Sequence, residues 1–227
     1  MMNCASEVSC FTGTRRAFLG GAASVLASIV PTCACGGEVG KGVVRESARD
    51  VPVRGDFDVV VAGGGPAGMA AAVMAARSGL KVLLVEGHGQ LGGVWTSGFL
   101  ACLIGFDSSE FDREILARLD GYDARSLRRP REGERSFVYE PEYMKLVCEE
   151  MCTEANVRVR LHTAVVGVLK DASGRNLEAV ITESKSGREA WRAKYFVDCT
   201  GDGDLGALAG CGFATPAPRA TAVPVMR

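Results

Sequence analysis

The sequence predicts an α/β fold built around a parallel sheet. A β-branched run at 57–62 ends in three glycines, an Ala- and Met-rich stretch at 66–78 begins with Pro and is followed by Gly79, and a second apolar run covers 80–85. A strand, a tight turn, a helix and a second strand within about 30 residues form a βαβ unit. Such a unit requires parallel strands joined by a right-handed crossover.

The composition describes a chain that folds into a globular domain. Of its 227 residues, 47% are hydrophobic, and 26 Lys and Arg stand against 27 Asp and Glu, for a formal net charge of -1. This balance argues against a disordered tail and against a basic protein that binds nucleic acid. The 29 glycines are clustered and follow no collagen-like period, so they are expected to mark turns and close backbone approaches.

Residues 1–35 are predicted to be an export signal. Arg15 and Arg16 lead into an apolar run at 17–30, which is shorter than the ~20 residues of a helix that crosses a bilayer. The segment resembles the twin-arginine export signal and departs from its pattern at Gly20, where the pattern has Lys. This resemblance implies export in the folded state, to the periplasm or cell envelope of a bacterial-type cell. An internal amphipathic helix is the alternative.

Two cysteines stand at the end of the predicted signal. Cleavage after Ala34 would make Cys35 the first residue, and a lipid on Cys33 or Cys35 is the alternative to simple cleavage. In either case the chain is expected to meet a membrane only through the signal or this lipid anchor.

A polar linker at 36–55 precedes the βαβ unit, and helical and loop patterns follow the unit. A charged amphipathic segment at 111–119 precedes an Arg-rich stretch at 125–135, which is expected to be a solvated loop, with anion or nucleic-acid binding as the alternative. Residues 141–155 predict a helix, because Pro stands at the first position and apolar residues recur at helical spacing.

The last third predicts a small antiparallel β-meander. Strand patterns cover 157–169, 177–183 and 191–199, with turn signals at Ser173–Gly174 and Ser186–Gly187. The third strand is expected to return to the main sheet. It ends in another glycine turn, which leads into an Ala- and Leu-containing segment.

The cysteines and histidines predict no metal site. His88 and His162 are far apart in the sequence, and the chain contains no CxxC motif. Cys148 and Cys152 share a face of the predicted helix and are expected to pack in the core, with a redox pair as the alternative.

The first glycine turn predicts a dinucleotide site. Gly63 permits the tight turn, Gly65 lets the backbone approach a pyrophosphate, and Gly68 lets the helix pack closely on the strand. Glu86 ends the second strand, where a carboxylate accepts hydrogen bonds from a ribose hydroxyl and repels a 2′-phosphate. FAD or NAD is therefore expected rather than NADP. A glycine turn that binds no nucleotide is the alternative.

The loop at 91–98 distinguishes these two cofactors. It has the sequence LGGVWTSG, and with the first glycine turn it resembles the glutathione-reductase-like flavoproteins, most closely the FAD-dependent oxidoreductases with a Gly-Gly-x-x-Thr-Ser-Gly loop. The resemblance implies FAD as the cofactor and a Rossmann-like three-layer FAD-binding domain at 56–212. It also implies that Gly92 and Gly93 lie along the FAD diphosphate and that 96–98 approaches the flavin ring. An ordinary loop is the alternative.

The resemblance extends into the last third of the chain. It implies that Val165 borders the adenine and that 197–204, with Cys199 where the family has Ala, faces the cofactor. Asp202 and Asp204 are expected to cap the following helix, with a catalytic pair as the alternative. No catalytic base is assigned. The predicted cofactor-binding residues are Gly63, Gly65, Pro66, Ala67, Gly68, Glu86, Gly92, Gly93, Thr96, Ser97, Val165, Gly201 and Asp202.

Beyond Gly212 the resemblance stops. Residues 213–227 do not match the corresponding segment of the family, so the substrate domain is predicted to be missing. In the whole family a hydride passes between a small-molecule substrate and the flavin, and an electron acceptor reoxidises the flavin. The sequence identifies neither molecule. It leaves open a flavoenzyme fragment, a module that binds FAD or NAD without turnover, and a non-enzymatic envelope protein that kept the fold.

Overall fold

The computed structural model describes residues 38–40, 42–104, 109–126 and 136–212. The predicted signal, the predicted tail and most of the Arg-rich stretch lie outside these residues. The chain divides into two units, Met1–Ala48 and Arg49–Arg227. The first unit contains a pair of antiparallel strands, β1 (Glu38–Gly40) and β2 (Val43–Arg45), within the predicted linker.

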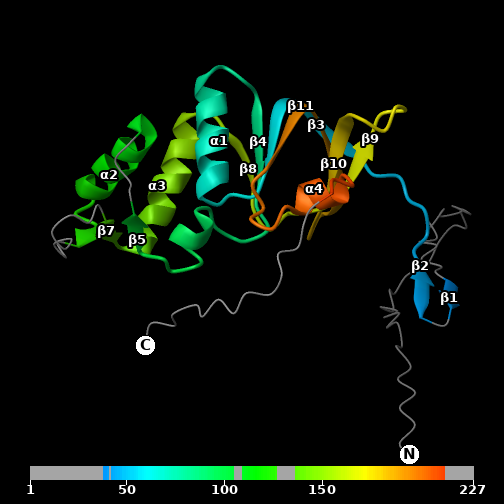
Figure 1. The fold of residues 1–227 in the computed structure, drawn as a ribbon, viewed down its shortest axis with the longest axis horizontal. Helices are drawn as coiled ribbons and strands as arrows, with labels where there is room; N and C mark the ends of the chain where they lie inside the picture. Colours follow the sequence, from blue (N-terminus) through cyan, green and yellow to red (C-terminus); the bar gives the residue numbers. More distant parts are fainter. Residues whose placement is uncertain (1–37, 41, 105–108, 127–135, 213–227) are drawn as a thin grey trace, which may run out of the picture. The chain divides into compact units, whose positions relative to one another are not determined.

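The second unit is built on one six-stranded sheet with the order β8-β4-β3-β11-β10-β9 (Figure 1). The strands β8, β4, β3 and β11 run parallel, whereas β11, β10 and β9 form an antiparallel meander. Both parts of the predicted fold class are therefore confirmed. The strands are β3 (Val53–Ala62), β4 (Val82–Val85), β8 (Arg158–Arg160), β9 (Ala164–Lys170), β10 (Leu177–Ser184) and β11 (Gly187–Asp198).

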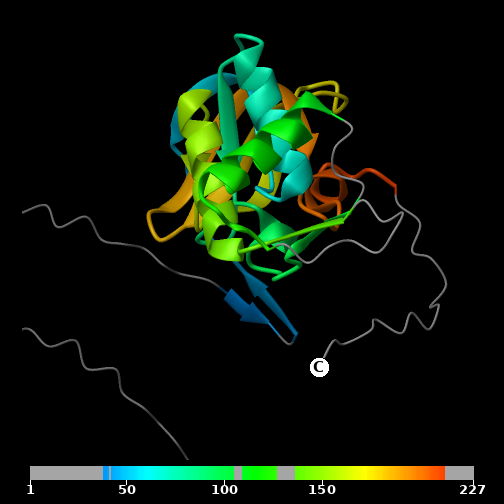
Figure 2. The same cartoon turned by 90° about the vertical axis from the view of Figure 1, so that its left-hand side faces the viewer.

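Helices α1 (Pro66–Arg77) and α3 (Pro141–Glu154) cover one face of the parallel sheet, and α2 (Glu110–Gly121) packs on α3. Figure 2 shows them in front of the sheet. Alternate residues of β3 point to opposite faces, as expected for a strand buried on both sides. Val59 and Val61 pack in the core beneath the helices, with Met69, Ile115 and Val147.

The meander and the short helix α4 (Asp204–Leu208) cover the opposite face. Val60 of β3 packs there with Leu83, Val180, Trp191 and Leu205. Helices, sheet and meander thus form the three layers expected from the sequence, with a separate hydrophobic core on each side of the parallel strands.

Smaller elements complete the second unit beside the helices. The 3-10 turn η1 (Gly93–Trp95) follows the second glycine loop, and the strands β5 (Cys102–Ile104), β7 (Ser136–Tyr139) and β6 (Arg125–Ser126) form a small antiparallel sheet. Among the described residues, none of the helices combines the length and apolar character needed to cross a membrane.

The prediction of a single strand at 157–169 was wrong, because these residues form two strands in different parts of the sheet. β8 pairs with β4 in the parallel part, and β9 begins the meander. The chain turns at His162, whose φ is +50°, an unusual backbone conformation for a residue other than glycine. Hydrogen bonds hold this turn against the end of β4: His162 N–H donates to His88 O at 2.9 Å, and Thr163 N–H donates to Glu86 O at 2.9 Å.

Cys148 and Cys152 of α3 pack in the core, as expected. Burial raises the pKa of each thiol to about 12, so both stay protonated at neutral pH. The Cys152 sulfur lies 3.7 Å from the Met69 sulfur of α1. Their position and protonation favour packing over the redox pair.

Candidate cofactor site

The turn between β3 and α1 requires glycine at two of its motif positions. Gly63 has φ of +100°, and a Cβ added there would lie 2.2 Å from the carbonyl oxygen of Cys199. A Cβ on Gly68 would lie 1.8 Å from the carbonyl oxygen of Gly63. These are the tight turn and the close helix approach that the spacing predicts.

Gly65 differs, because a Cβ added there would meet no atom within 4 Å. It is the N-cap of α1, which begins at Pro66 without a side-chain cap and without an acidic residue in its first turn. The first N–H groups of a helix have no partner within the helix, and they carry a partial positive charge. The start of α1, including Ala67 and Gly68, therefore offers donors toward open space, as anion-binding helix termini do.

The second glycine loop lies directly against the first. Gly92 N–H donates to Gly64 O at 2.8 Å, and a Cβ on Gly93 would lie 2.9 Å from Gly65 Cα. Gly92 has φ of +98° and Gly93 has φ of +52°. The structure thus brings the predicted diphosphate residues of both loops together in front of α1.

The side chains of Thr96 and Ser97 stabilise this second loop. Thr96 is completely buried, and its hydroxyl donates to the carbonyl oxygen of Leu91 at 2.5 Å. The Ser97 hydroxyl accepts a hydrogen bond from the Gln90 side chain at 2.9 Å. The Thr96 side chain is therefore turned into the protein, and the predicted approach of 96–98 to the flavin remains a prediction about the loop as a whole.

Glu86 is held in place by three donors. Gly64 N–H donates to Oε2 at 2.6 Å, and His88 N–H donates to Oε1 at 2.7 Å. His88 Nδ1 lies 2.7 Å from the same Oε1. The carboxylate has about four acceptor positions, so it keeps capacity for a further donor on Oε2. No such role was assigned to His88 from the sequence. Its position two residues after Glu86 was the feature that could have indicated a contact with the carboxylate.

A pocket of about 170 Å³, the cofactor pocket, lies beside this carboxylate. Three predicted residues line it: Gly63, Glu86 and Val165 of β9. The other lining residues come from three segments: 85–88, where His88 was missed, 163–164, directly before the predicted Val165, and 200–204, within the stretch expected to face the cofactor. They are Val85, Gly87, His88, Thr163, Ala164, Thr200 and Asp204.

The glycine turn after β11 is closed by side chains of its own. The Asp198 carboxylate accepts hydrogen bonds from Gly206 N–H at 2.8 Å and from the Thr200 hydroxyl at 2.7 Å. The Thr200 hydroxyl accepts from Asp204 N–H at 2.9 Å. In the described part of the chain, the Asp202 and Asp204 carboxylates accept no hydrogen bond, so the expected capping by these two residues was wrong. Asp198 and Thr200 stand before the glycines and reach back over the turn.

Hydrogen bonding also sets the ionisation of Asp198. Burial by itself would raise the pKa of this carboxyl, but the N–H groups of Gly206 and Thr200 and the Thr200 hydroxyl together lower it. Gly201 has φ of +93°, and Asp202 is exposed next to it. These two predicted residues lie in the turn but do not line the cofactor pocket.

The donors and acceptors of the site fit a dinucleotide. The start of α1 has open space beside Gly65 and no side-chain cap on its N–H groups, which suits a diphosphate, and the ordered Glu86 carboxylate beside a pocket suits a ribose. No set of three or more His, Cys, Asp or Glu side chains suited to a metal ion occurs in the described ranges.

Comparison with known proteins agrees with this geometry. The model of the family described as FAD dependent oxidoreductase matches residues 58–223, which continues past the boundary at 212 expected from the sequence. Pseudooxynicotine dehydrogenase of a Pseudomonas species is 38% identical over 96 residues, 41% of this chain and 19% of that protein. Dihydrolipoyl dehydrogenase of Trypanosoma brucei brucei is 53% identical over 45 residues, 20% of this chain and 9% of that protein. The matches thus span a small part of each relative.

Solved structures show the same fold at low sequence identity. OxyS anhydrotetracycline hydroxylase from Streptomyces rimosus superposes with a TM-score of 0.55 and 19% identity, over 72% of this chain and 35% of that one. The flavin-dependent brominase Bmp2 superposes with a TM-score of 0.53 and 19% identity, over 68% of this chain and 40% of that one.

Proposed function

Because the chain belongs to the FAD-dependent oxidoreductase family and binds FAD, we propose that it forms the cofactor-binding part of an enzyme that transfers a hydride between a small organic substrate and the flavin. The observation that supports this most directly is the contact between the two glycine loops at the start of α1. It creates one surface of backbone donors next to an ordered carboxylate.

Each part of this surface has a role toward FAD in the proposal. The first-turn N–H groups of α1, including those of Ala67 and Gly68, donate to the diphosphate, and Gly65 and Gly93 allow its close approach. Glu86 accepts a ribose hydroxyl, which requires no movement of its carboxylate because Gly64 and His88 already orient it.

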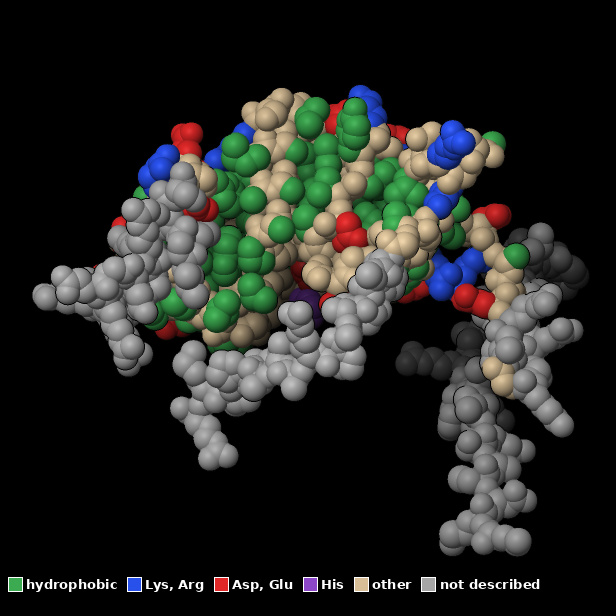
Figure 3. All heavy atoms as spheres, in the orientation of Figure 1, with side chains coloured by type: hydrophobic (Ala, Val, Ile, Leu, Met, Phe, Trp, Pro, Cys, Tyr) green, Lys and Arg blue, Asp and Glu red, His purple; other side chains and the backbone are tan. Residues whose placement is uncertain are grey.

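The loop after Gly93 is proposed to border the flavin. Bound FAD supplies a ring system that accepts or releases a hydride. Val94 and Phe99 stay 52% and 72% exposed beside this loop, and Phe99 has φ of +52°. Figure 3 shows hydrophobic side chains gathered on one face of the molecule, over α1 and below it. A flat ring or an apolar substrate lying there would remove this surface from water.

We also propose the finer assignments made from the sequence. The LGGVWTSG loop supports a place in the glutathione-reductase-like branch, and the Arg15–Arg16 segment supports twin-arginine export to the periplasm or cell envelope. A small-molecule substrate and an electron acceptor are the partners that such a reaction needs.

Flavin retention tests the proposal. The full chain is purified and dialysed, its visible absorption is recorded, and dithionite is then added. We expect a flavin spectrum that survives dialysis and bleaches on reduction, with about one FAD per chain, since the proposal assigns one dinucleotide site to the described residues. A colourless protein whose melting temperature does not rise with added FAD would contradict it. Flavin that binds but exchanges no electrons with dithionite would favour the binding module without turnover.

A further inference from the structure

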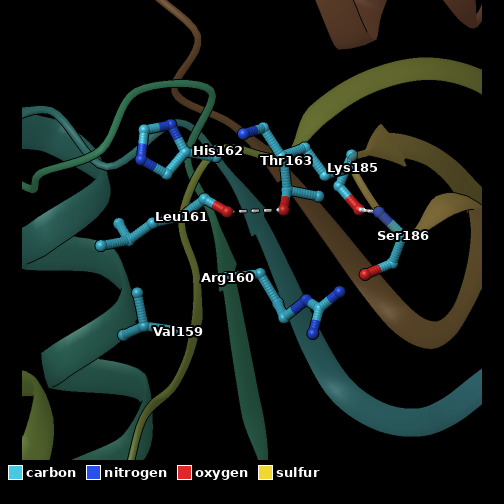
Figure 4. Close-up of a pocket in the computed structure, with 8 residues that line it drawn as sticks. Val159, Arg160, Leu161, His162, Thr163, Lys185 and Ser186 are labelled. Atoms are coloured by element: carbon cyan, nitrogen blue, oxygen red, sulfur yellow. Dashed lines mark hydrogen bonds between the residues drawn. The ribbon is translucent and has the colours of Figure 1, made fainter.

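A second cavity lies on the other side of the segment that borders the cofactor pocket. This cavity, the basic pocket, has a volume of about 460 Å³ and is open to solvent between the end of β8 and the β10–β11 turn (Figure 4). It is within the size range of small-molecule sites. Its lining residues are Val159, Arg160, Leu161, His162, Thr163, Ser184, Lys185 and Ser186.

The segment Leu161–Thr163 separates the two pockets. Thr163 lines both of them, and this segment is hydrogen-bonded to the chain that follows β4, through His162 N–H to His88 O and Thr163 N–H to Glu86 O. The basic pocket is therefore a neighbour of the cofactor pocket with an ordered wall between them.

One arginine, Arg160, lines the basic pocket, and its guanidinium belongs to a cluster of charged side chains behind it. Arg160 extends from β8 toward the turn that carries Lys185 and Ser186 (Figure 4). Its guanidinium donates to the Glu189 carboxylate at 2.5 Å, and Arg54 donates to the other oxygen of Glu189 at 2.9 Å. Glu189 is buried, so two cations already share one desolvated carboxylate.

Two more cations are close to this cluster: Lys185, which lines the pocket, and Arg158, which does not. Arg158 and Arg160 both lie 5.5 Å from the ring centroid of Trp191, which holds them on the same side of β8. In the part of the chain that the structure describes, neither Arg158 nor Lys185 has an ion-pair partner. The neighbouring Glu183 is paired with Arg188 at 2.7 Å. The pocket therefore has an excess of positive charge.

The other lining residues of the basic pocket indicate which chemical group a bound anion would carry. Val159 and Leu161 supply an apolar surface, while Ser186 adds a hydroxyl and Thr163 directs its own hydroxyl to Leu161 O at 2.8 Å. Separate guanidinium and ammonium donors suit the several oxygens of a phosphate dianion. We propose that the basic pocket binds a phosphate monoester with a small apolar group, at the same time as FAD occupies the cofactor pocket.

Calorimetric titration with phenyl phosphate tests this proposal. The full chain is titrated at fixed ionic strength, with and without saturating FAD, and phenol serves as the uncharged comparison. We expect saturable binding of one phenyl phosphate in both conditions and no comparable binding of phenol. The charge reversal Lys185→Glu is expected to weaken binding at least about tenfold, because a hydrogen bond to a charged donor is lost and a like charge is introduced.

Matched variants separate this site from general electrostatics. Lys170→Glu makes the same change of charge at an exposed lysine of β9 outside the pocket and should leave the affinity for phenyl phosphate within about twofold. Arg158→Gln should weaken binding without breaking the Glu189 ion pairs. The proposal is overturned if wild-type protein shows no saturable binding, if Lys170→Glu and Lys185→Glu lose affinity equally, or if FAD displaces phenyl phosphate. Flavin absorption measured in the same samples reports cofactor binding separately.

Discussion

Two strands that lie side by side, β3 and β11, both end in a glycine turn that leads into a helix, yet the two turns use their backbone donors in opposite ways. The turn into α1 has glycine at the N-cap and no side-chain acceptor. The turn into α4 has Asp198 and Thr200, whose side chains accept the N–H groups of Gly206 and Asp204. A glycine-rich turn after a strand is therefore not sufficient to identify an anion site.

The glycines themselves differ in the same way. Gly63 and Gly68 are surrounded by backbone atoms that a Cβ would strike, whereas Gly201 and Gly203 have open space around them. In the first turn glycine is required by packing, and at Gly63 by its positive φ as well; in the second turn it is required by backbone conformation alone, where φ is +93° and +78°.

The largest effect is expected from alanine at the first turn. Gly63→Ala places a Cβ 2.2 Å from a backbone oxygen at positive φ, so we expect a loss of more than about 4 kcal/mol in unfolding free energy, or insoluble protein. Gly201→Ala is the matched control and should cost about 1 to 2 kcal/mol, the strain of the left-handed conformation alone. Urea unfolding measures both. Equal losses would show that crowding at Cys199 does not distinguish the two turns.

A charged cap on α1 should separate stability from FAD binding. Gly65 has φ of -71° and ψ of -173°, which suits Asp at an N-cap, so Gly65→Asp should leave the helix as stable or more so. Its carboxylate would occupy the donors proposed for the diphosphate and repel it, and we expect FAD affinity to fall at least about 100-fold. Flavin fluorescence titration measures this, with Gly65→Asn as the uncharged control. Unchanged affinity in Gly65→Asp would exclude the start of α1 from the FAD site.

Removing the charge of Glu86 should have a smaller effect on the same titration. Glu86→Gln keeps the side-chain shape but weakens the acceptor toward a ribose hydroxyl and toward Gly64 N–H, so we expect FAD to bind about 10 to 100 times more weakly. Glu178→Gln, on the exposed side of β10, is the control. If both variants bind FAD as the wild type does, the ribose assignment is wrong.

The smallest effect is expected at the second turn. Asp198→Asn should leave FAD binding intact and lower stability at neutral pH by about 1 kcal/mol or less, since a charged cap is replaced by a neutral one. The pKa of Asp198 is lower in the folded state than in the unfolded state, so its stabilisation is present above the unfolded pKa and is lost as pH falls through the folded pKa. Below the ordinary pKa of an aspartate, about 4, unfolding should therefore depend less steeply on pH in Asp198→Asn. Identical pH profiles would contradict this.

Local sequence patterns were enough to predict β3, the first glycine turn, α1 and β4, because neighbouring residues specify each of them. The break at His162 carried no Gly or Pro signal, and it depends on hydrogen bonds to residues 86–88 that the fold supplies. His88 was missed as a pocket residue for the same reason, since its position depends on strand order. Thr163 and Thr200 lie in stretches that were expected to border the cofactor, although neither was named as a site residue. Side-chain capping of α4 was expected from the sequence, but it was assigned to Asp202 and Asp204. The residues that cap the helix are Asp198 and Thr200, which lie before the turn.

The position of β11 next to β3 also constrains the order in which the protein can be made. Val59 pairs with Tyr195 and Ala62 with Asp198, and Gly63 rests against the Cys199 carbonyl. While residues 195–199 are still in the ribosome, β3 lacks its neighbour β11, and Gly63 of the first turn lacks its contact with Cys199. Pairings of such long sequence separation form slowly and expose strand edges until they do. We therefore expect the complete dinucleotide site to form only after β11 has been translated.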